Sequence, residues 1–225
     1  MARPVLEVRD LCVVSDTTTA FRDINFAVEA GRVLCVLGAE GAGKSQLLRC
    51  IGLDFPPSSG AILLRGTDVT GVSSERRRQL RAAAIELVHP PAPAGVRDKT
   101  VPGARTGVLL QASSGPTAPV AGMRQRIQIA KALALGADAL LLDEPFEGVE
   151  QGVRNRILEL LQRLRTETET AVVVASRDPE VARAVADEIL VLHDGEVVET
   201  GPAGDVLESP RHHRTRMLVE GRRSA

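Results

Sequence analysis

The chain has 225 residues but very few aromatic side chains, with four Phe, no Tyr and no Trp. It also has only three cysteines, Cys12, Cys35 and Cys50, whose odd number and irregular spacing argue against a disulfide framework or a metal site. No apolar run approaches the roughly 18 residues of a membrane-spanning helix, and the N-terminus lacks the pattern of a signal peptide. We therefore expect buried free thiols and a soluble, cytoplasmic chain that reaches a membrane only through a partner.

The chain also lacks an excess of charge of either sign. It has 28 Lys and Arg against 29 Asp and Glu, for a net charge of −1. Binding to nucleic acid requires a basic face, so we expect no nucleic acid as a partner. Two local basic stretches, residues 76–78 and 211–216, are interpreted as solvated faces, with docking to a partner or to acidic lipid as the alternative.

Apolar stretches alternate with helix-like stretches along most of the sequence. This order predicts an α/β fold with a mostly parallel sheet covered by helices and an antiparallel β part at the N-terminus. A hairpin is expected at residues 188–201, turning at Asp194 and Gly195. The other expected strands are 5–14, 23–28, 32–38, 61–66, 83–88, 139–143 and 171–176. The expected helices are 43–52, 75–81, 123–136, 153–165 and 179–186. Ser74 is expected to cap the helix at residues 75–81.

Residues 89–121 differ from the rest because Pro and Gly recur there and little periodicity remains. A compact domain rarely holds so long a stretch without regular structure, so we interpret it as flexible or functional. We expect one domain over residues 1–225. Its expected parts are an N-terminal β part with a phosphate-loop core (1–88), a reduced segment (89–121), a second core segment (122–200) and a tail (201–225).

The stretch GAEGAGKS, residues 38–45, matches the phosphate-loop pattern G-x-x-x-x-G-K-S and lies between an expected strand and an expected helix. Its backbone N–H groups are expected to surround the phosphates, Lys44 to bridge the β- and γ-phosphates, and the Ser45 hydroxyl to bind Mg²⁺. The alternative is a glycine-rich turn without a ligand. The predicted nucleotide-binding residues are Gly38, Ala39, Glu40, Gly41, Ala42, Gly43, Lys44, Ser45 and Gln46.

Two carboxylates follow the apolar stretch 139–142, about 100 residues after the phosphate loop. An Asp at the end of a buried strand beside that loop is expected to hold Mg²⁺, which assigns Asp143 as a metal residue. Glu144 comes next and is expected to polarise the attacking water as a general base. The alternative is a turn of two exposed acids.

These motifs and the sequence around them resemble the ATP-binding subunits of ABC transporters over almost the whole chain. The similar stretches are 5–11, 31–45, 124–145 and 186–202, and residues 205–221 are similar to the tail of dipeptide, oligopeptide and nickel importer subunits. The resemblance implies a P-loop ATPase fold, Mg-ATP, a second nucleotide-binding domain and transmembrane permease subunits. It also implies a location at the cytoplasmic face of the cell membrane.

The chain departs from the family at the parts that contact a partner's nucleotide or sense the γ-phosphate. The signature Leu-Ser-Gly-Gly-Gln reads PVAGM at residues 119–123, so Val120 replaces the serine. Arg177 replaces the switch histidine. A guanidinium only donates hydrogen bonds and stays charged, so we expect Arg177 to clamp the γ-phosphate without relaying a proton. A surface Arg paired with Asp178 or Glu180 is the alternative.

Three further departures concern the glutamine loop, the adenine platform and the helical subdomain. His89 and Pro90 stand where Phe-Gln is expected, and the loop after Glu144 ends in Glu150 instead of Asp. Phe21 is the nearest aromatic for adenine, with core packing as its alternative role. The helical subdomain is shortened and irregular. A missing stacking platform costs on the order of 1–3 kcal/mol.

These features predict an ATP-binding subunit whose hydrolysis is slow or depends on a partner, and that transports peptides as one possibility. A hetero-partner with an intact signature fits better than a homodimer, because it would complete this chain's phosphate-loop site. One alternative is a nucleotide-binding pseudo-ATPase with a regulatory or scaffolding role. The other is a non-transport P-loop enzyme such as a small-molecule kinase.

Overall fold

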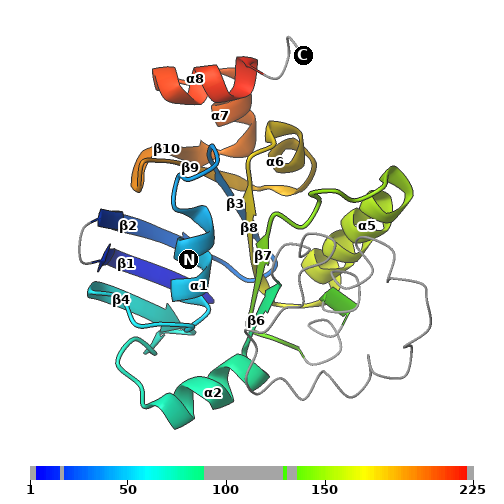
Figure 1. The fold of residues 1–225 in the computed structure, drawn as a ribbon. Helices are drawn as coiled ribbons and strands as arrows, with labels where there is room; N and C mark the ends of the chain where they lie inside the picture. Colours follow the sequence, from blue (N-terminus) through cyan, green and yellow to red (C-terminus); the bar gives the residue numbers. More distant parts are fainter. Residues whose placement is uncertain (1–3, 16–17, 89–128, 131–135, 222–225) are drawn as a thin grey trace, which may run out of the picture.

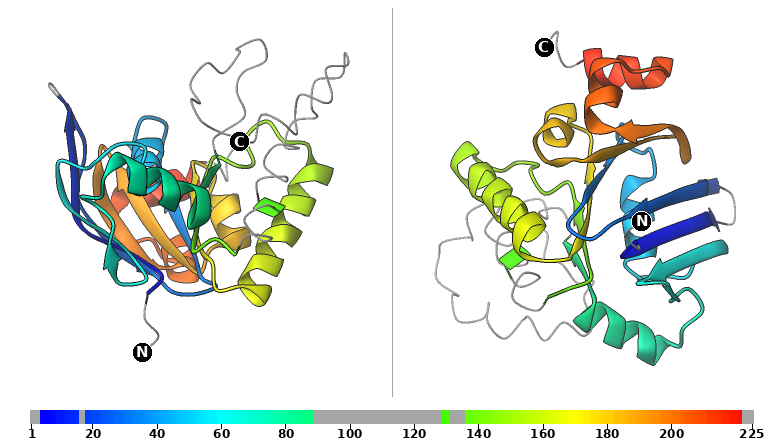
Figure 2. Two further views of the ribbon diagram at one scale, coloured as in Figure 1. Left: turned by 90° about the horizontal axis from the view of Figure 1, so that it is seen from below. Right: turned by 180° about the vertical axis from the view of Figure 1, so that it is seen from behind.

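The structure is a computed structural model that describes residues 4–15, 18–88, 129–130 and 136–221. Within these residues the strands form two sheets, one of four strands and one of six. Figures 1 and 2 show the smaller sheet on one side of the larger one, with helices on the opposite side. The architecture confirms the predicted α/β fold with an antiparallel N-terminal part and a mostly parallel sheet.

The smaller sheet is antiparallel, with strand order β2-β1-β4-β5. The β1–β2 pairing contains register shifts between Val8 and Val14, where the strands bend. β2 is longer than the sequence pattern predicts because it begins at Thr18 instead of residue 23. The bounds are Leu6–Ser15 for β1, Thr18–Val28 for β2, Ser59–Leu64 for β4 and Thr67–Asp68 for β5.

The larger sheet has the strand order β10-β9-β3-β8-β7-β6. Its strands are parallel except for β10, which returns antiparallel beside β9 through the predicted turn. Asp194 and Gly195 have φ values of 47° and 79°, a conformation that this tight hairpin turn requires. The bounds are Val33–Leu37 for β3, Ile85–Val88 for β6, Ala139–Asp143 for β7, Ala171–Ser176 for β8, Glu188–His193 for β9 and Glu196–Pro202 for β10.

Helices cover both faces of the larger sheet. α1 lies between the two sheets, and α5 and α6 cover the other face of the larger sheet. α7 and α8 pack near β9 and β10 at the C-terminal end of the described chain (Figure 1). The bounds are Lys44–Ile51 for α1, Ser74–Ala83 for α2, Gln151–Glu167 for α5, Pro179–Val185 for α6, Ala203–Glu208 for α7 and His213–Glu220 for α8.

Strand β7 shows why the central strands are apolar at every position. Leu141 packs into the core shared with α1 and the smaller sheet, whereas Leu140 and Leu142 pack into the core under α5. All three side chains are fully buried. Because successive side chains of a strand point to opposite faces, a strand buried on both faces must be apolar throughout. The sheet is therefore held from both sides, and its strand ends are fixed in space.

Ser73, not Ser74 as predicted, caps helix α2. Its side chain accepts a hydrogen bond from the backbone N–H of Arg76 at 3.2 Å, while Ser74 is already the first helical residue. The cap lies one residue earlier because the side chain must reach the N–H three residues ahead. Both serines lie at the start of the same helix, so the sequence alone does not show which of them is the cap.

The cysteines are free thiols, as predicted, although Cys12 is only half-buried. Burial raises the pKa of Cys50 to about 12, so its thiol stays protonated at neutral pH. Among the described residues, no helix is long and apolar enough to cross a membrane.

Candidate nucleotide site

Three neighbouring strands of the larger sheet bring the predicted site residues to one edge. In this sheet β3 pairs with β8 and β8 pairs with β7, all parallel, with Leu37 opposite Ser176 and Asp143 opposite Ala175. The segments that follow these strands begin at residues 38, 144 and 177 and therefore start side by side. The carboxyl ends of parallel strands are where open α/β sheets bind ligands.

Two glycines of residues 38–45, Gly38 and Gly43, are required by close backbone approaches. A Cβ on Gly38 would lie 2.4 Å from the carbonyl oxygen of Leu192, and one on Gly43 would lie 2.7 Å from that of Ala20. Gly43 also has a φ of 100°, which favours glycine. The loop is thus pressed against β2 and the β9–β10 hairpin.

Lys44 is held at the mouth of this loop by the loop itself. Its ammonium donates hydrogen bonds to the carbonyl oxygens of Gly38 at 2.8 Å and Ala39 at 2.9 Å, and lies 3.5 Å from Glu144 Oε1. The side chain is only 6% exposed. A buried ammonium with movable donors fits an anionic ligand. Ala39, Glu40 and Gly41 form the exposed rim of the loop, and Gln46 is exposed at the start of α1.

Ser45 and Asp143 meet although 98 positions separate them. The Ser45 hydroxyl donates a hydrogen bond to Asp143 Oδ1 at 3.1 Å, and Asp143 is 2% exposed. A hydroxyl and a carboxylate beside a phosphate cradle are the hard oxygen donors that Mg²⁺ prefers. The residues present therefore fit a magnesium ion bound together with a nucleotide.

Glu144 lies between the Lys44 ammonium and a backbone N–H donor. Its Oε1 is 3.5 Å from the Lys44 ammonium, and its Oε2 accepts a hydrogen bond from the backbone N–H of Arg177 at 3.3 Å. Burial raises the pKa of Glu144 above its ordinary value, although Lys44 and the Arg177 N–H act in the opposite direction. A carboxylate with a raised pKa beside a phosphate cradle is suited to accept a proton from water.

The side chain of Arg177 also lies at this edge. Its guanidinium Nη2 is 2.5 Å from Glu147 Oε1, and its Nη1 is 3.9 Å from Glu40 Oε2. The acids that the structure places beside Arg177 thus come from the segment after Glu144 and from the rim of the phosphate loop. No sequence motif singled out Glu147.

The structure assigns Phe21 to the core and not to a nucleotide-binding surface. Its side chain is fully buried, which confirms the core-packing alternative and leaves no face for adenine. Glu150 precedes α5 as its N-cap residue without a side-chain capping bond. The predictions for His89, Pro90 and residues 119–123 lie outside the described residues.

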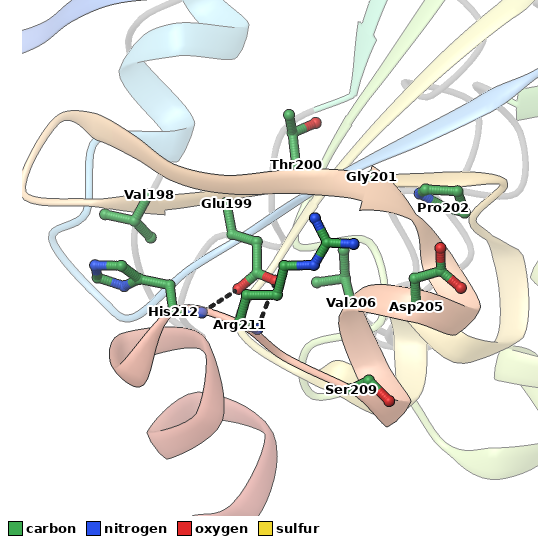
Figure 3. A pocket seen from close by; sticks show the side chains of 10 residues that line it. All are labelled: Val198, Glu199, Thr200, Gly201, Pro202, Asp205, Val206, Ser209, Arg211 and His212. Atoms are coloured by element: carbon green, nitrogen blue, oxygen red, sulfur yellow. Dashed lines mark hydrogen bonds between the residues drawn. The ribbon is translucent and has the colours of Figure 1, made fainter.

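A separate hollow of about 450 Å³ lies between β10, α7 and the segment before α8, away from the phosphate loop. Figure 3 shows the Glu199 side chain directed from β10 toward this segment, where it accepts hydrogen bonds from the backbone N–H groups of Arg211 at 2.8 Å and His212 at 3.0 Å. These bonds attach the C-terminal segment to β10. The Asp194–Gly195 turn of the same hairpin contacts the phosphate loop through Gly195 N–H and the Ala42 carbonyl, 3.2 Å apart.

Comparison with known proteins identifies close sequence relatives. A family model described as ABC transporter matches residues 21–94. A phosphonates utilization ATP-binding protein, PhnK, of Escherichia coli is 31% identical over 97% of this chain and 98% of its own length. The di/tripeptide transport ATP-binding protein DppF of Pseudomonas aeruginosa is 31% identical over 89% of this chain and 70% of its own length. The chain spans 61% of the methionine import protein MetN of Corynebacterium glutamicum, at 33% identity.

Solved structures agree on the fold. An ATP-binding subunit of an ABC transporter superposes with a TM-score of 0.71 at 22% identity, over 96% of this chain and 98% of its own. The cbiO1 protein of Clostridium perfringens gives a TM-score of 0.72 at 24% identity, over 98% of this chain and 97% of its own. These comparisons give no support to a small-molecule kinase. The predicted family is confirmed: the chain belongs to the ATP-binding proteins of ABC transporters, which use ATP with Mg²⁺.

Proposed function

We propose that the chain is the nucleotide-binding subunit of an importer and binds Mg-ATP with residues 38–46 and Asp143. The observation that supports this most directly is the pairing of Ser45 with Asp143, together with the approach of Lys44 to Glu144. Four side chains from two distant motifs meet at one edge of the larger sheet. This is the arrangement that phosphate binding and water activation require.

Each of these groups has a distinct part in the proposed chemistry. The loop amides and the Lys44 ammonium bind the phosphates, and Mg²⁺ held by Ser45 and Asp143 would neutralise phosphate charge. Glu144 accepts the proton of the attacking water at a carboxylate oxygen. Arg177 contributes a permanent positive charge at the place where the γ-phosphate of a nucleotide bound in the loop would lie.

We further propose that the chain works with permease subunits at the cytoplasmic face of the membrane and pairs with a second, different nucleotide-binding domain. The names of its relatives mention phosphonates, methionine and di/tripeptides. Together with the tail at residues 205–221, they support a small polar solute as cargo, with peptides as one class.

Calorimetry of the full chain with Mg-ATP tests the nucleotide site. We expect saturable binding that Lys44→Ala weakens by about 10- to 100-fold, because charge-assisted hydrogen bonds contribute about 1.5–3 kcal/mol. Glu144→Gln should retain binding and lose hydrolysis by at least about 100-fold. Glu159→Gln, the same change at an exposed position of α5, is the matched control and should alter neither.

Three outcomes would contradict the proposal or a part of it. If the well-folded chain releases no heat of binding at millimolar Mg-ATP, the assignment of the site is wrong. If Glu144→Gln hydrolyses ATP at the wild-type rate, the base is another residue. If binding is normal but hydrolysis is absent even with a partner domain, the chain is the pseudo-ATPase of the alternative hypothesis.

A further inference from the structure

The guanidinium of Arg177 spans the mouth of the phosphate loop. One nitrogen, Nη2, lies 2.5 Å from Glu147 Oε1, and the other, Nη1, lies 3.9 Å from Glu40 Oε2. Glu147 belongs to the segment after Glu144, whereas Glu40 is on the rim of the loop. The side chain thus joins the two segments that enclose the candidate nucleotide site.

The backbone of Arg177 is fixed while its guanidinium is accessible. Arg177 directly follows strand β8, whose last residue pairs with the end of β3. Its backbone N–H donates a hydrogen bond to Glu144 Oε2 at 3.3 Å. The Arg177 and Glu147 side chains are 42% and 43% exposed. An ion pair this exposed is weak and exchanges readily. The guanidinium can therefore change partner without moving the strand that carries it.

A guanidinium binds carboxylate and phosphate with the same planar set of N–H donors. Glu147 and a terminal phosphate bound at the loop mouth would therefore compete for one group. A nucleoside triphosphate brings such a phosphate, while a diphosphate held by the same loop ends one phosphate earlier. Only the triphosphate would gain from taking the guanidinium away from Glu147.

We propose that Glu147 is a specificity-determining residue that sets how strongly the chain distinguishes ATP from ADP. Its carboxylate holds the Arg177 guanidinium, and a nucleotide must displace it to use that charge. This competition lowers affinity for triphosphate and leaves affinity for diphosphate unchanged. The inference rests on the proposed function, because it requires nucleotide in the phosphate loop.

The test measures dissociation constants of the full chain for Mg-ADP and for the magnesium complex of the β,γ-imido analogue of ATP, which is not hydrolysed. We expect Glu147→Gln to tighten analogue binding roughly two- to fivefold, the range of an exposed ion pair, and to leave Mg-ADP binding unchanged. Glu159→Gln removes the same charge from an exposed position of α5 and is the matched control. It should change neither constant.

The same substitution in an Arg177→Ala background separates competition from simple repulsion. If Glu147 acts by holding Arg177, Glu147→Gln should have no effect on either constant in that background. A gain that persists there, or a gain equal for both nucleotides, would show like-charge repulsion and overturn the inference. Weaker analogue binding by Glu147→Gln would overturn it too, because Glu147 would then orient Arg177 toward the phosphate.

Two further results keep this inference distinct from the proposed function. If the folded wild-type chain binds neither nucleotide, the proposed function fails. If it binds both and Glu147→Gln matches Glu159→Gln, only the role of Glu147 fails. Because all of the substituted side chains are at least partly exposed, thermal unfolding by circular dichroism should show wild-type folding for each variant.

Discussion

Glu144 is under more local strain than its neighbours at the site. Its φ is 43°, in the left-handed region that non-glycine residues rarely adopt. Its side chain is also largely buried, and burial raises its pKa. Burial disfavours an ionised glutamate here, while the positive φ is unfavourable for any residue except glycine, so this residue is placed for chemistry at the expense of stability.

This conflict predicts that Glu144→Gln stabilises the folded chain at neutral pH, by about 0.5–2 kcal/mol. The folded-state pKa is above the unfolded value, so the folded state binds the proton more tightly. The resulting stability is fully present below the unfolded pKa and is lost as the pH rises through the raised pKa. The advantage of Gln should therefore be small in acid and reach its plateau above the raised pKa.

Urea unfolding of the wild type and of the Glu144→Gln variant at several pH values between about 4 and 8 measures this difference. Glu159→Gln, at an exposed position, should not reproduce it. A difference that is constant across the pH range, or that grows toward acid, would show that ionisation of Glu144 does not cause it.

The pattern of residues 38–45 predicts a phosphate loop at this place because the motif itself encodes a backbone shape and a ligand chemistry. The meeting of Ser45 with Asp143 follows from the motif and the parallel sheet together. Glu147 could not be predicted, since its contact with Arg177 joins residues 30 positions apart through side-chain geometry alone. A motif records spacing along the chain, whereas this contact depends on how two loops lie relative to each other in space.

At the scale of elements, the β9–β10 hairpin connects the phosphate loop to the C-terminal helices. Its turn contacts Ala42 through the N–H of Gly195, and Glu199 holds the segment before α8. Burial opposes ionisation of Glu199, but hydrogen bonds from the N–H groups of Arg211 and His212 hold its pKa below the ordinary value. The attachment therefore depends on an ionised carboxylate.

Glu199→Ala should release the C-terminal segment locally. The loss of two hydrogen bonds to a charged acceptor should cost about 1.5–3 kcal/mol. Hydrogen exchange should rise in residues 203–220 and remain near wild type in β3 and β7. Glu208→Ala, at an exposed position of α7, is the control and should leave exchange unchanged. Uniformly faster exchange over the whole chain would show a global effect instead of a local attachment.

The hairpin was predictable because Asp194 and Gly195 give a strong local turn signal. Its contact with the phosphate loop was not predictable, because no periodicity indicates which loop a turn will contact. The start of β2 at Thr18 was missed for a related reason. In the sequence alone, these polar Thr residues are typical of a loop. Pairing with β1 nevertheless extends strand β2 back to Thr18.

At the scale of the whole molecule, the hydrophobic cores on both faces of the larger sheet account for the confirmed fold. Apolar strands and amphipathic helices specified the layers, whereas the strand order could not be read from the chain, because β3 lies between β8 and β9 although it comes long before both. The division of residues 1–225 into functional parts remains a prediction, as does the role of residues 119–123. These depend on a partner and on a segment that lie outside the described residues.

The missing hydroxyl at Val120 predicts that restoring it raises the activity of the chain alone. Val120→Ser should increase ATP turnover at least about tenfold, because one correctly placed donor to a reacting phosphate contributes a large factor. Val14→Ser, the same change at a 56% exposed side chain, is the control. Turnover unchanged by Val120→Ser, but restored by an intact partner domain, would assign the defect to another part of the signature.

The reacting groups lie beyond the ends of β3, β7 and β8, outside both cores. The residues that pack the cores therefore differ from those that carry the proposed chemistry, and one set of residues can change without the other. A lineage could exchange its histidine or serine for arginine or valine and still produce a well-folded subunit.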